Sequence, residues 1–410
     1  MIITNCRAYN DGKISEKEIL ILEGKIARIA GRIPENEAMG EERIDASGLI
    51  VIPGLIDVHV HLREPGAEYK EDFVTGTKAA LAGGVTTVLD MPNNKVPTTT
   101  LRRLREKEEL AQKKALCDLR FYMGATNDNF AEIKKANPIA VKVYMGKTTG
   151  DLLVTEDEIM ERHFSNFDRK KPITVHAEDQ KHIEAHSGKR TEEAAEIAVK
   201  RAVTLAEKTK RKLHIAHAST PQEIEIAKEE ADGQKLRANV SIETAPHYLF
   251  LSQKDADKLK HLGTVNPPLR SEETRKALWK KLDSIDCIAT DHAPHTLEDK
   301  KDGARGFPGL ETSLALMLDA YNKRLLELDW IINKMTKNPA KIFGLTNLGR
   351  ISVGFRADLA FIDLKKEWTV RGEELETKCK WSPFEGKKLR GKTVKTIFNG
   401  KLVYEDGGII

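Results

Sequence analysis

The residues of this chain that are best suited to bind a metal ion recur at intervals, and each lies in or next to a short apolar run. His59 and His61 stand two positions apart in the run LIDVHVHL (55–62). Because alternate side chains of a β-strand share a face, both imidazoles can bind one metal ion. Further candidate ligands lie in later runs: Lys142, His176, His217, Glu243 and Asp291. A set of nitrogen and oxygen donors without thiolates favours a divalent ion, zinc first, with a position open to water.

Lys142 lies within IAVKVYM (139–145), where burying an unpaired ammonium group would be costly. Two interpretations are open. The lysine forms a buried ion pair with a carboxylate such as Glu243, or desolvation deprotonates the amine, which then adds carbon dioxide. The resulting carbamate is an anion with two oxygen atoms, so it could bridge two metal ions. The sequence does not distinguish between these interpretations.

Four other histidines are expected to take no part in metal binding. His182 and His186 have the i, i+4 spacing of two ligands on one helix face, but they lack the full HExxH order. They follow a predicted strand at the point where an exposed helix should begin, so a solvated face is expected. His163 and His261 lie in polar helical sequence and are expected at the surface.

The elements that position the candidate ligands are β-type segments that alternate with helical segments rich in Lys and Glu, such as 101–115. The strands are predicted at 55–62, 85–91, 118–124, 139–145, 173–178, 212–218, 237–243 and 286–293. Eight strand–helix units predict an α/β fold, a closed parallel TIM (β/α)8 barrel. Such barrels place their active sites at the C-terminal ends of the strands, where the candidate ligands lie. His214 and His217 are three positions apart, so at most one should point into the site.

The two ends of the chain differ from this middle part. EILIL (18–22) and KIARIA (25–30) flank a turn, and KTIF and KLVY flank Asn399-Gly400, a strong hairpin signal. A lone hairpin is marginally stable in water, so the terminal strands should pair with one another. We therefore expect a small composite β domain, 1–52 plus 346–410, beside a catalytic barrel domain, 53–345.

Composition excludes several classes of protein. Lys and Arg total 67 against 63 Asp and Glu, and this small excess gives no reason to expect nucleic acid or an anionic membrane as a partner. The four cysteines lie far apart, so no disulfide framework is expected and the cytoplasm is the expected compartment. The N-terminal segment turns polar before a signal-peptide core could form, and the apolar runs are too short to cross a bilayer.

Motifs along the whole chain resemble those of the dihydroorotases in the amidohydrolase superfamily. They are GLIDVHVHLREPG (54–66), MPN (91–93), VHAE (175–178), ETAPHYLFL (243–251), NPPLR (266–270), DHAPH (291–295) and GFPGLET (306–312). The resemblance implies reversible, zinc-dependent hydrolysis of (S)-dihydroorotate to N-carbamoyl-L-aspartate in pyrimidine biosynthesis. It implies two zinc ions per chain bridged by a carboxylated lysine, with ligands His59, His61, Lys142, His176, His217 and Asp291, and Glu243 as a ligand of a further metal.

The resemblance also implies how substrate is bound. The expected substrate residues are Arg63, Asn93 and His295 at the carboxylate, and Asn266, Pro308 and Gly309 at the ring. The planar fork of Arg63 suits a carboxylate. Asp291 is expected to act as general base and then as general acid. Thr148 and Thr149 match a loop that closes over substrate in relatives.

Two alternatives remain for the function. The first is another cyclic amidohydrolase, an allantoinase, hydantoinase or dihydropyrimidinase, whose metal ligands would be the same. Arg63 and NPPLR (266–270) argue against it, because only a substrate with a carboxylate beside the ring requires Arg63 there. The second is a non-catalytic scaffold for aspartate transcarbamoylase. Such homologues typically lack some metal ligands, whereas this chain retains them all. Aspartate transcarbamoylase is also the partner expected of an active enzyme.

Overall fold

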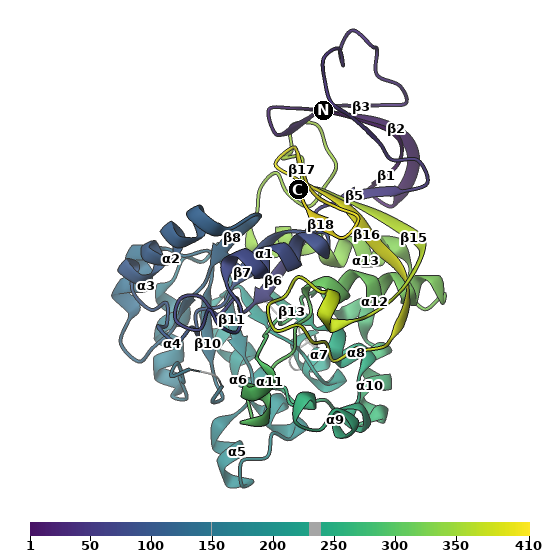
Figure 1. Ribbon diagram of the computed structural model, residues 1–410. Helices are drawn as coiled ribbons and strands as arrows, with labels where there is room; N and C mark the ends of the chain where they lie inside the picture. The colour runs from purple at the N-terminus through teal and green to yellow at the C-terminus, as the bar shows by residue number, and fades with distance from the viewer. Residues whose placement is uncertain (149, 229–238) are drawn as a thin grey trace.

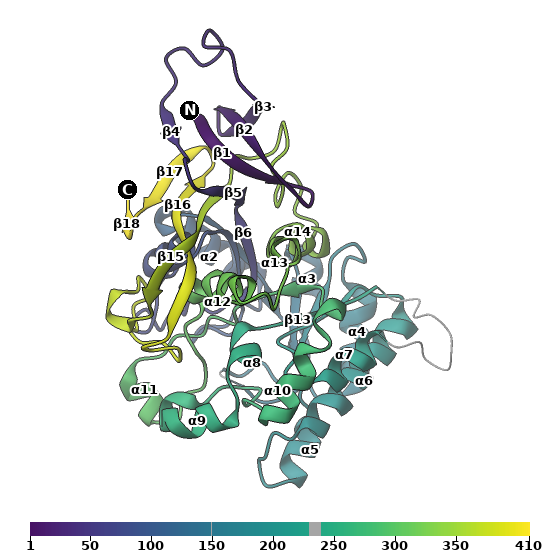
Figure 2. The same cartoon turned by 90° about the vertical axis from the view of Figure 1, so that its right-hand side faces the viewer.

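The computed structural model describes residues 1–148, 150–228 and 239–410. It has a mixed α/β fold in which parallel sheets in the middle of the chain are flanked by helices, and one antiparallel-rich sheet is built from both ends (Figure 1). Both termini lie at this antiparallel-rich sheet, above the helices and parallel strands in Figures 1 and 2. None of the described helices is long and apolar enough to cross a bilayer.

The parallel strands follow the predicted alternation with helices. Two sheets contain them, in the orders β6-β7-β8 and β14-β13-β12-β11-β10-β9. The strands are β6 (Leu55–Val60), β7 (Val85–Asp90), β8 (Asp118–Phe121), β9 (Met123–Gly124), β10 (Val141–Tyr144), β11 (Ile173–His176), β12 (Leu213–Ile215), β13 (Val240–Thr244) and β14 (Cys287–Ile288). Each lies within a predicted segment or overlaps one by most of its residues, although residues 237 and 238 of the seventh segment lie outside the described residues.

The described helices lie between these strands in the chain or follow the last of them. They are α1 (Phe73–Ala82), α2 (Leu101–Lys114), α3 (Phe130–Ala136), α4 (Asp157–Asn166), α5 (Gln180–Ala185), α6 (Glu192–Thr209), α7 (Pro221–Lys228), α8 (Pro246–Phe250), α9 (Gln253–Leu259), α10 (Glu272–Trp279), α11 (Leu297–Lys301), α12 (Leu310–Asn322), α13 (Leu328–Met335) and α14 (Lys337–Phe343). Local sequence sets their ends. Asp72 caps α1 by accepting from Thr75 N, and Gly83 follows its last residue as the C-cap.

The terminal sheet has the order β18-β17-β16-β15-β5-β1-β2-β3, with β4 paired to β1. Its strands are β1 (Ile2–Asn10), β2 (Lys13–Leu22), β3 (Lys25–Ala30), β4 (Arg43–Asp45), β5 (Ile50–Pro53), β15 (Leu359–Thr369), β16 (Lys388–Phe398), β17 (Lys401–Glu405) and β18 (Gly408–Ile409). Both predicted hairpins are present as antiparallel pairs. β5 joins the two ends of the chain, because it pairs with β1 on one side and β15 on the other.

A buried ion pair supports the loop after β7. Lys107 Nζ lies 2.6 Å from Asp90 Oδ2, and both side chains are 0% exposed. Lys107 also donates to Met91 O (3.1 Å) and Asn94 Oδ1 (2.7 Å), on either side of the predicted substrate residue Asn93. Asp90 Oδ1 accepts from Leu62 N, 2.7 Å away. The pair therefore connects α2 to the chain after β6 and the loop after β7.

Lys107→Met is expected to lower the free energy of unfolding by about 3–5 kcal/mol, because Asp90 would remain buried without its cation. Burial already raises the pKa of Asp90 and lowers the pKa of Lys107, so each depends on its partner. Urea unfolding followed by circular dichroism measures the change. Lys113→Met, at an exposed position of the same helix, is the matched control. Equal stability of the two variants would show that the ion pair contributes nothing.

Candidate metal centre

The two histidines of the HxH pair converge with Asp291. His59 belongs to β6 and His61 follows its end; their Nε2 atoms lie 3.3 and 3.1 Å from Asp291 Oδ1. One donor atom from each of the three residues lies within 4.8 Å of the others. Asp291 follows β14, and an isolated parallel bridge between Val60 and His292 brings the two strand ends together. The first and last predicted strands thus supply one group of three donors.

A second pair of imidazoles lines the same pocket as His59, His61 and Asp291. His176 closes β11 and His217 lies two residues beyond β12; His176 Nδ1 is 2.8 Å from His217 Nε2. His217 adopts a positive φ of 41°, an uncommon conformation for a residue with a Cβ. The neighbouring His214, by contrast, does not line the pocket. The expectation that at most one of His214 and His217 points into the site is therefore confirmed.

Electrostatics leave these groups in the forms that bind cations. Burial lowers the pKa of His61 to about 3 despite the opposing effect of Asp291, and burial also lowers the pKa of His176 and His217. Burial alone would raise the pKa of Asp291, but the nearby His59 and His61 outweigh it and hold that pKa well below its usual range. Neutral imidazoles and an ionised carboxylate are the forms that bind metal ions.

Lys142 reaches the pocket from β10 and is 0% exposed. Among the described residues its Nζ has no hydrogen-bond partner, and the ion pair with Glu243 that the sequence left open is not formed. Burial lowers the pKa of Lys142 to about 8, against the opposing effects of Glu243 and Asp291. A buried amine with no partner, which is partly neutral near that pH, is the chemical requirement for adding carbon dioxide.

Glu243 lies on the other side of the His59 ring. Its Oε1 is 2.5 Å from His59 Nδ1, and its Oε2 is 2.9 Å from His214 Nε2. His214 Nδ1 in turn lies 2.9 Å from Ser241 Oγ. Carboxylates placed in this way orient a metal-binding histidine and fix which ring nitrogen carries the proton. Glu243 also forms a second group of potential donors with His214 and Cys287, separate from the group of His59, His61 and Asp291. The role of Glu243 as a metal ligand therefore stays a prediction.

Glu178 has the corresponding place beside His176, and the sequence interpretation did not assign it a role. Its Oε2 lies 2.9 Å from His176 Nε2, and it also forms an ion pair with Arg190. Burial opposes ionisation, but His176 and Arg190 lower the pKa of Glu178. The motif VHAE (175–178) could have indicated this contact, because Glu178 stands two positions after His176 and would share its side of the predicted strand.

These donors fit divalent metal ions. Imidazole nitrogens, the Asp291 carboxylate and a buried amine with no hydrogen-bond partner among the described residues all reach one pocket. The described residues that line it are His59, His61, Arg63, Asn93, Lys142, Tyr144, Thr148, His176, His217, Val265, Asn266, Asp291, Ala293, Arg305 and Gly306. Imidazole and carboxylate together suit zinc and similar borderline ions.

The predicted substrate residues fall into two sets. Arg63 and Asn93 line the pocket; Arg63 Nη2 lies 3.0 Å from His295 Nε2, and Asn93 Oδ1 lies 2.7 Å from His61 Nδ1. Asn266 also lines it. Pro308 and Gly309 are not among its lining residues, and neither is His295. Thr148 lines the pocket, whereas Thr149 lies outside the described residues.

Arg305 is a pocket residue that the sequence analysis missed. Its Nη1 donates to Asn266 Oδ1 over 3.0 Å, and its carbonyl oxygen lies 3.1 Å from His295 Nε2. It stands directly before the motif GFPGLET (306–312), so its nearness to that motif was the available signal. Arg305 therefore places a second guanidinium at the pocket, and its side chain is exposed whereas that of Arg63 is buried.

The other histidines divide as follows. His186 is exposed and His182 half-buried, their rings stack at 3.9 Å, and among the described residues no potential metal group includes them. His261 is exposed, as expected. The expectation for His163 was wrong: it is buried, its ring packs 4.2 Å from that of Phe130, and its Nε2 donates to Thr126 O. One satisfied hydrogen bond allows this imidazole to be buried within a polar sequence.

Three comparisons relate this chain to known proteins. The model of the amidohydrolase family matches residues 50–403. Dihydroorotase from Pyrococcus abyssi is 43% identical over 409 residues, 98% of this chain and 94% of that protein. Multifunctional protein CAD from Squalus acanthias is 38% identical over 88% of this chain, a match that spans 15% of CAD. The solved L-hydantoinase (dihydropyrimidinase) from Arthrobacter aurescens superposes with a TM-score of 0.93 at 31% identity, covering 100% of this chain and 97% of that one.

Proposed function

Since the chain belongs to the dihydroorotases of the amidohydrolase family, we propose that its pocket hydrolyses (S)-dihydroorotate to N-carbamoyl-L-aspartate and catalyses the reverse closure in pyrimidine biosynthesis. The chain is a hydrolase that acts on a cyclic amide. The observation that carries the choice of substrate is the buried guanidinium of Arg63 at the rim of the metal-binding group. An anionic ring substituent would pair with this cation through two charge-assisted hydrogen bonds.

The metal centre we propose holds two zinc ions. The proposed ligands are His59, His61, Lys142 as a carbamate, His176, His217 and Asp291. When bound, the ions would make a water molecule acidic enough to attack near neutral pH and would polarise the ring carbonyl group. Glu243 and Glu178 would orient His59 and His176 through the ring nitrogens that face away from the pocket.

The protein residues then carry the proton and hold the substrate. Asp291 would take the proton of the attacking water and return it to the ring nitrogen as the carbon–nitrogen bond breaks. We propose that Arg63, Asn93 and His295 bind the substrate carboxylate, and that Asn266 with the backbone at Pro308 and Gly309 faces the ring. Asn266 can offer both a donor and an acceptor to an amide edge.

The experiment that tests the proposed function compares substrates on the zinc-loaded enzyme. Dihydroorotate, dihydrouracil, hydantoin and allantoin are supplied separately, and ring opening is followed together with zinc content per chain. We expect about two zinc ions and rapid opening of dihydroorotate alone. Faster opening of hydantoin would favour the second candidate function, a hydantoinase, which the fold of the Arthrobacter enzyme supports. Zinc without any turnover would favour a scaffold.

Lys142→Ala is expected to lose metal and activity together, because the variant lacks the lysine carbamate that would help to hold the ions. Short carboxylic acids should restore part of both, since they can fill the space with a carboxylate. Zinc analysis and dihydroorotate hydrolysis, each with and without added acid, measure these effects. Lys147→Ala, at an exposed lysine near the pocket, is the control and should be unaffected. A bare ammonium at Lys142 in a crystal structure with both metals bound would contradict the carbamate.

We also propose the domain arrangement that the sequence predicted. The parallel strands would close into an eight-stranded barrel over 53–345, and the terminal sheet would form a small domain from 1–52 and 346–410. Two contacts support closure. The bridge between Val60 and His292 joins the end of β6 to the chain after β14. The hydrogen bond from Met123 N to Ala140 O joins the segment 118–124, which contains β8 and β9, to the start of β10. The cytoplasm is the proposed compartment, on the spacing of the cysteines. Aspartate transcarbamoylase is the proposed partner, a proposal supported by the match to the multifunctional protein CAD.

A further inference from the structure

A segment of the C-terminal part of the chain lies against two loops around the pocket and the start of α12. This segment, Leu375–Trp381, is part of the connection between β15 and β16, and we call it the strap. Its Thr377 Oγ1 donates to Glu71 Oε2 over 2.5 Å, and its Trp381 Nε1 donates to the carbonyl oxygen of His295 over 2.8 Å. The strap therefore contacts both the loop after β6 and the loop after β14.

Its backbone makes further contacts with buried acceptors. The amides of Glu376 and Thr377 donate to the Glu311 carboxylate at the start of α12, over 2.9 and 3.1 Å. The amide of Lys378 lies 3.3 Å from each carboxylate oxygen of Glu71. The strap is thus held by two acidic side chains of the catalytic part of the chain, through bonds that a change of strap side chain would mostly preserve.

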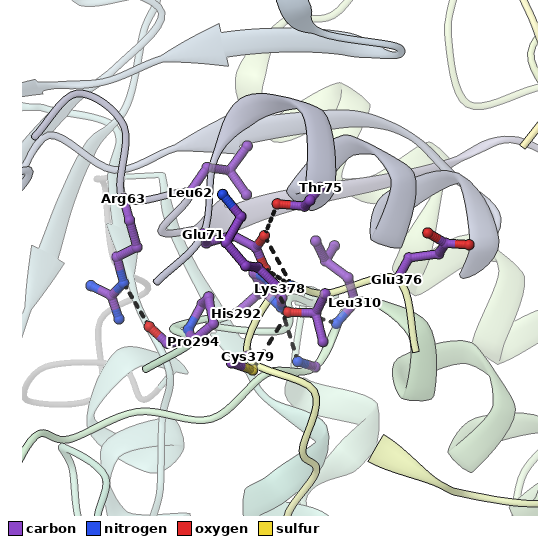
Figure 3. Close-up of polar contacts among 12 residues, drawn as sticks. Leu62, Arg63, Glu71, Thr75, His292, Pro294, Leu310, Glu376, Lys378 and Cys379 are labelled. Carbon is purple, nitrogen blue, oxygen red and sulfur yellow. Dashed lines mark hydrogen bonds and ion pairs between the residues drawn. The ribbon is translucent and has the colours of Figure 1, made fainter. Parts of the chain in front are cut away.

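Glu71 lies between the strap and His292. The Glu71 carboxylate is completely buried and accepts from Thr75 as well as from the strap (Figure 3). Its Oε2 also lies 3.4 Å from His292 Nε2, a buried nitrogen that has no hydrogen-bond partner among the described residues. His292 is itself buried, and it directly follows the proposed general base Asp291. Figure 3 shows His292 between Glu71 and the segment at Pro294, to which Arg63 donates.

His292 in turn holds the loop that the sequence predicted to face the substrate ring. Its Nδ1 accepts from Gly309 N over 3.1 Å, so the ring proton belongs on Nε2, the nitrogen that faces Glu71. Ala293 N donates to Phe307 O over 2.7 Å. Gly306 approaches so closely that a Cβ there would lie 2.5 Å from the Ala293 carbonyl oxygen. The path runs from Thr377 through Glu71 and His292 to Gly309.

We propose that the strap is a positioning element for substrate binding, which acts through Glu71 and His292 on residues 306–310, the ring-facing loop. The proposal rests on the proposed function, because that function assigns the loop to the substrate. Neither Thr377 nor the rest of the strap lines the pocket. A change in the strap should therefore alter the affinity for substrate, while the metal ligands and Asp291 stay in place.

Thr377→Val tests the proposal with a change of one hydroxyl to a methyl group. The variant loses the donor to Glu71, so we expect KM for dihydroorotate to rise about tenfold, with kcat and zinc content within about twofold of the parent enzyme. Thr396→Val is the matched control: Thr396 is equally buried, lies in β16 and donates its hydroxyl to Leu81 O over 2.8 Å, away from the loop. Thr396→Val should lower the melting temperature as much as Thr377→Val does, and its KM for dihydroorotate should equal that of the parent enzyme.

Hydrogen exchange supplies a readout that needs no substrate. The amides of Gly309 and Leu310 should exchange faster in Thr377→Val than in Thr396→Val, because both donate to His292 Nδ1 at the end of the path described. Equal exchange in both variants, or equal KM values for the two threonine variants, would overturn the proposal. If the parent enzyme opens no dihydroorotate, the proposed function fails, and the exchange experiment still decides the role of the strap.

Discussion

Asp291→Asn is expected to keep its zinc ions and to lose activity on dihydroorotate by about a hundredfold or more. An asparagine oxygen can still approach a cation, but it cannot take the proton of the attacking water. The arrangement of the residue supports both roles, since Asp291 Oδ1 lies 3.3 Å from His59 Nε2 and 3.1 Å from His61 Nε2. The measurements are zinc content per chain and initial rates in both directions of the reaction.

The control for this experiment is Asp302→Asn, which changes an exposed aspartate just after α11. It should match the parent enzyme in rate and in metal. Near-normal hydrolysis by a folded, zinc-loaded Asp291→Asn variant would remove Asp291 from the role of general base. Loss of zinc together with activity would leave it as a ligand alone. The two outcomes separate proton transfer from metal binding, which the sequence could not do.

The positions of the metal-binding candidates could be predicted because they depend on periodicity. Strands repeat a two-residue alternation, and parallel strands bring their carboxyl ends to one side. The spacing of His59 and His61 and the place of Asp291 at the end of the last predicted strand follow from those rules. The hairpin at Asn399-Gly400 was predictable for a similar reason, since a tight turn requires residues that adopt a positive φ.

Local departures from regular structure could not be predicted. Arg63, His217 and Asp291 all have a positive φ, and no local rule requires that conformation at these residue types. Such backbone geometry is stable only when the surrounding structure enforces it, and it is frequent at functional sites. The burial of His163 depends on a carbonyl oxygen 37 residues earlier in the chain. The contact between Thr377 and Glu71 spans 306 residues, and no sequence pattern indicates it.

Discrimination among cyclic amides should depend on Arg63, and this is the second large effect we expect. The side chain is only 6% exposed, and burial lowers the pKa of its guanidinium from the ordinary value. Its Nε donates to Pro294 O over 3.0 Å, which fixes the direction of the fork. A buried guanidinium without an anion carries a cost of several kcal/mol, and the carboxylate of dihydroorotate would remove it. Dihydrouracil, hydantoin and allantoin have no anion at that position.

The parent enzyme should therefore favour dihydroorotate over dihydrouracil by roughly a thousandfold in kcat/KM. Arg63→Gln should abolish most of that preference and leave the zinc content unchanged, because Arg63 is not a proposed ligand. Arg305→Gln is the matched control: it also removes a guanidinium from the pocket, but from a side chain exposed to water, where an ion pair contributes little. Rates for both substrates with all three proteins decide the question. If the parent enzyme opens dihydrouracil or allantoin as fast as dihydroorotate, the assignment to the amidohydrolase family stands and the proposed substrate is wrong.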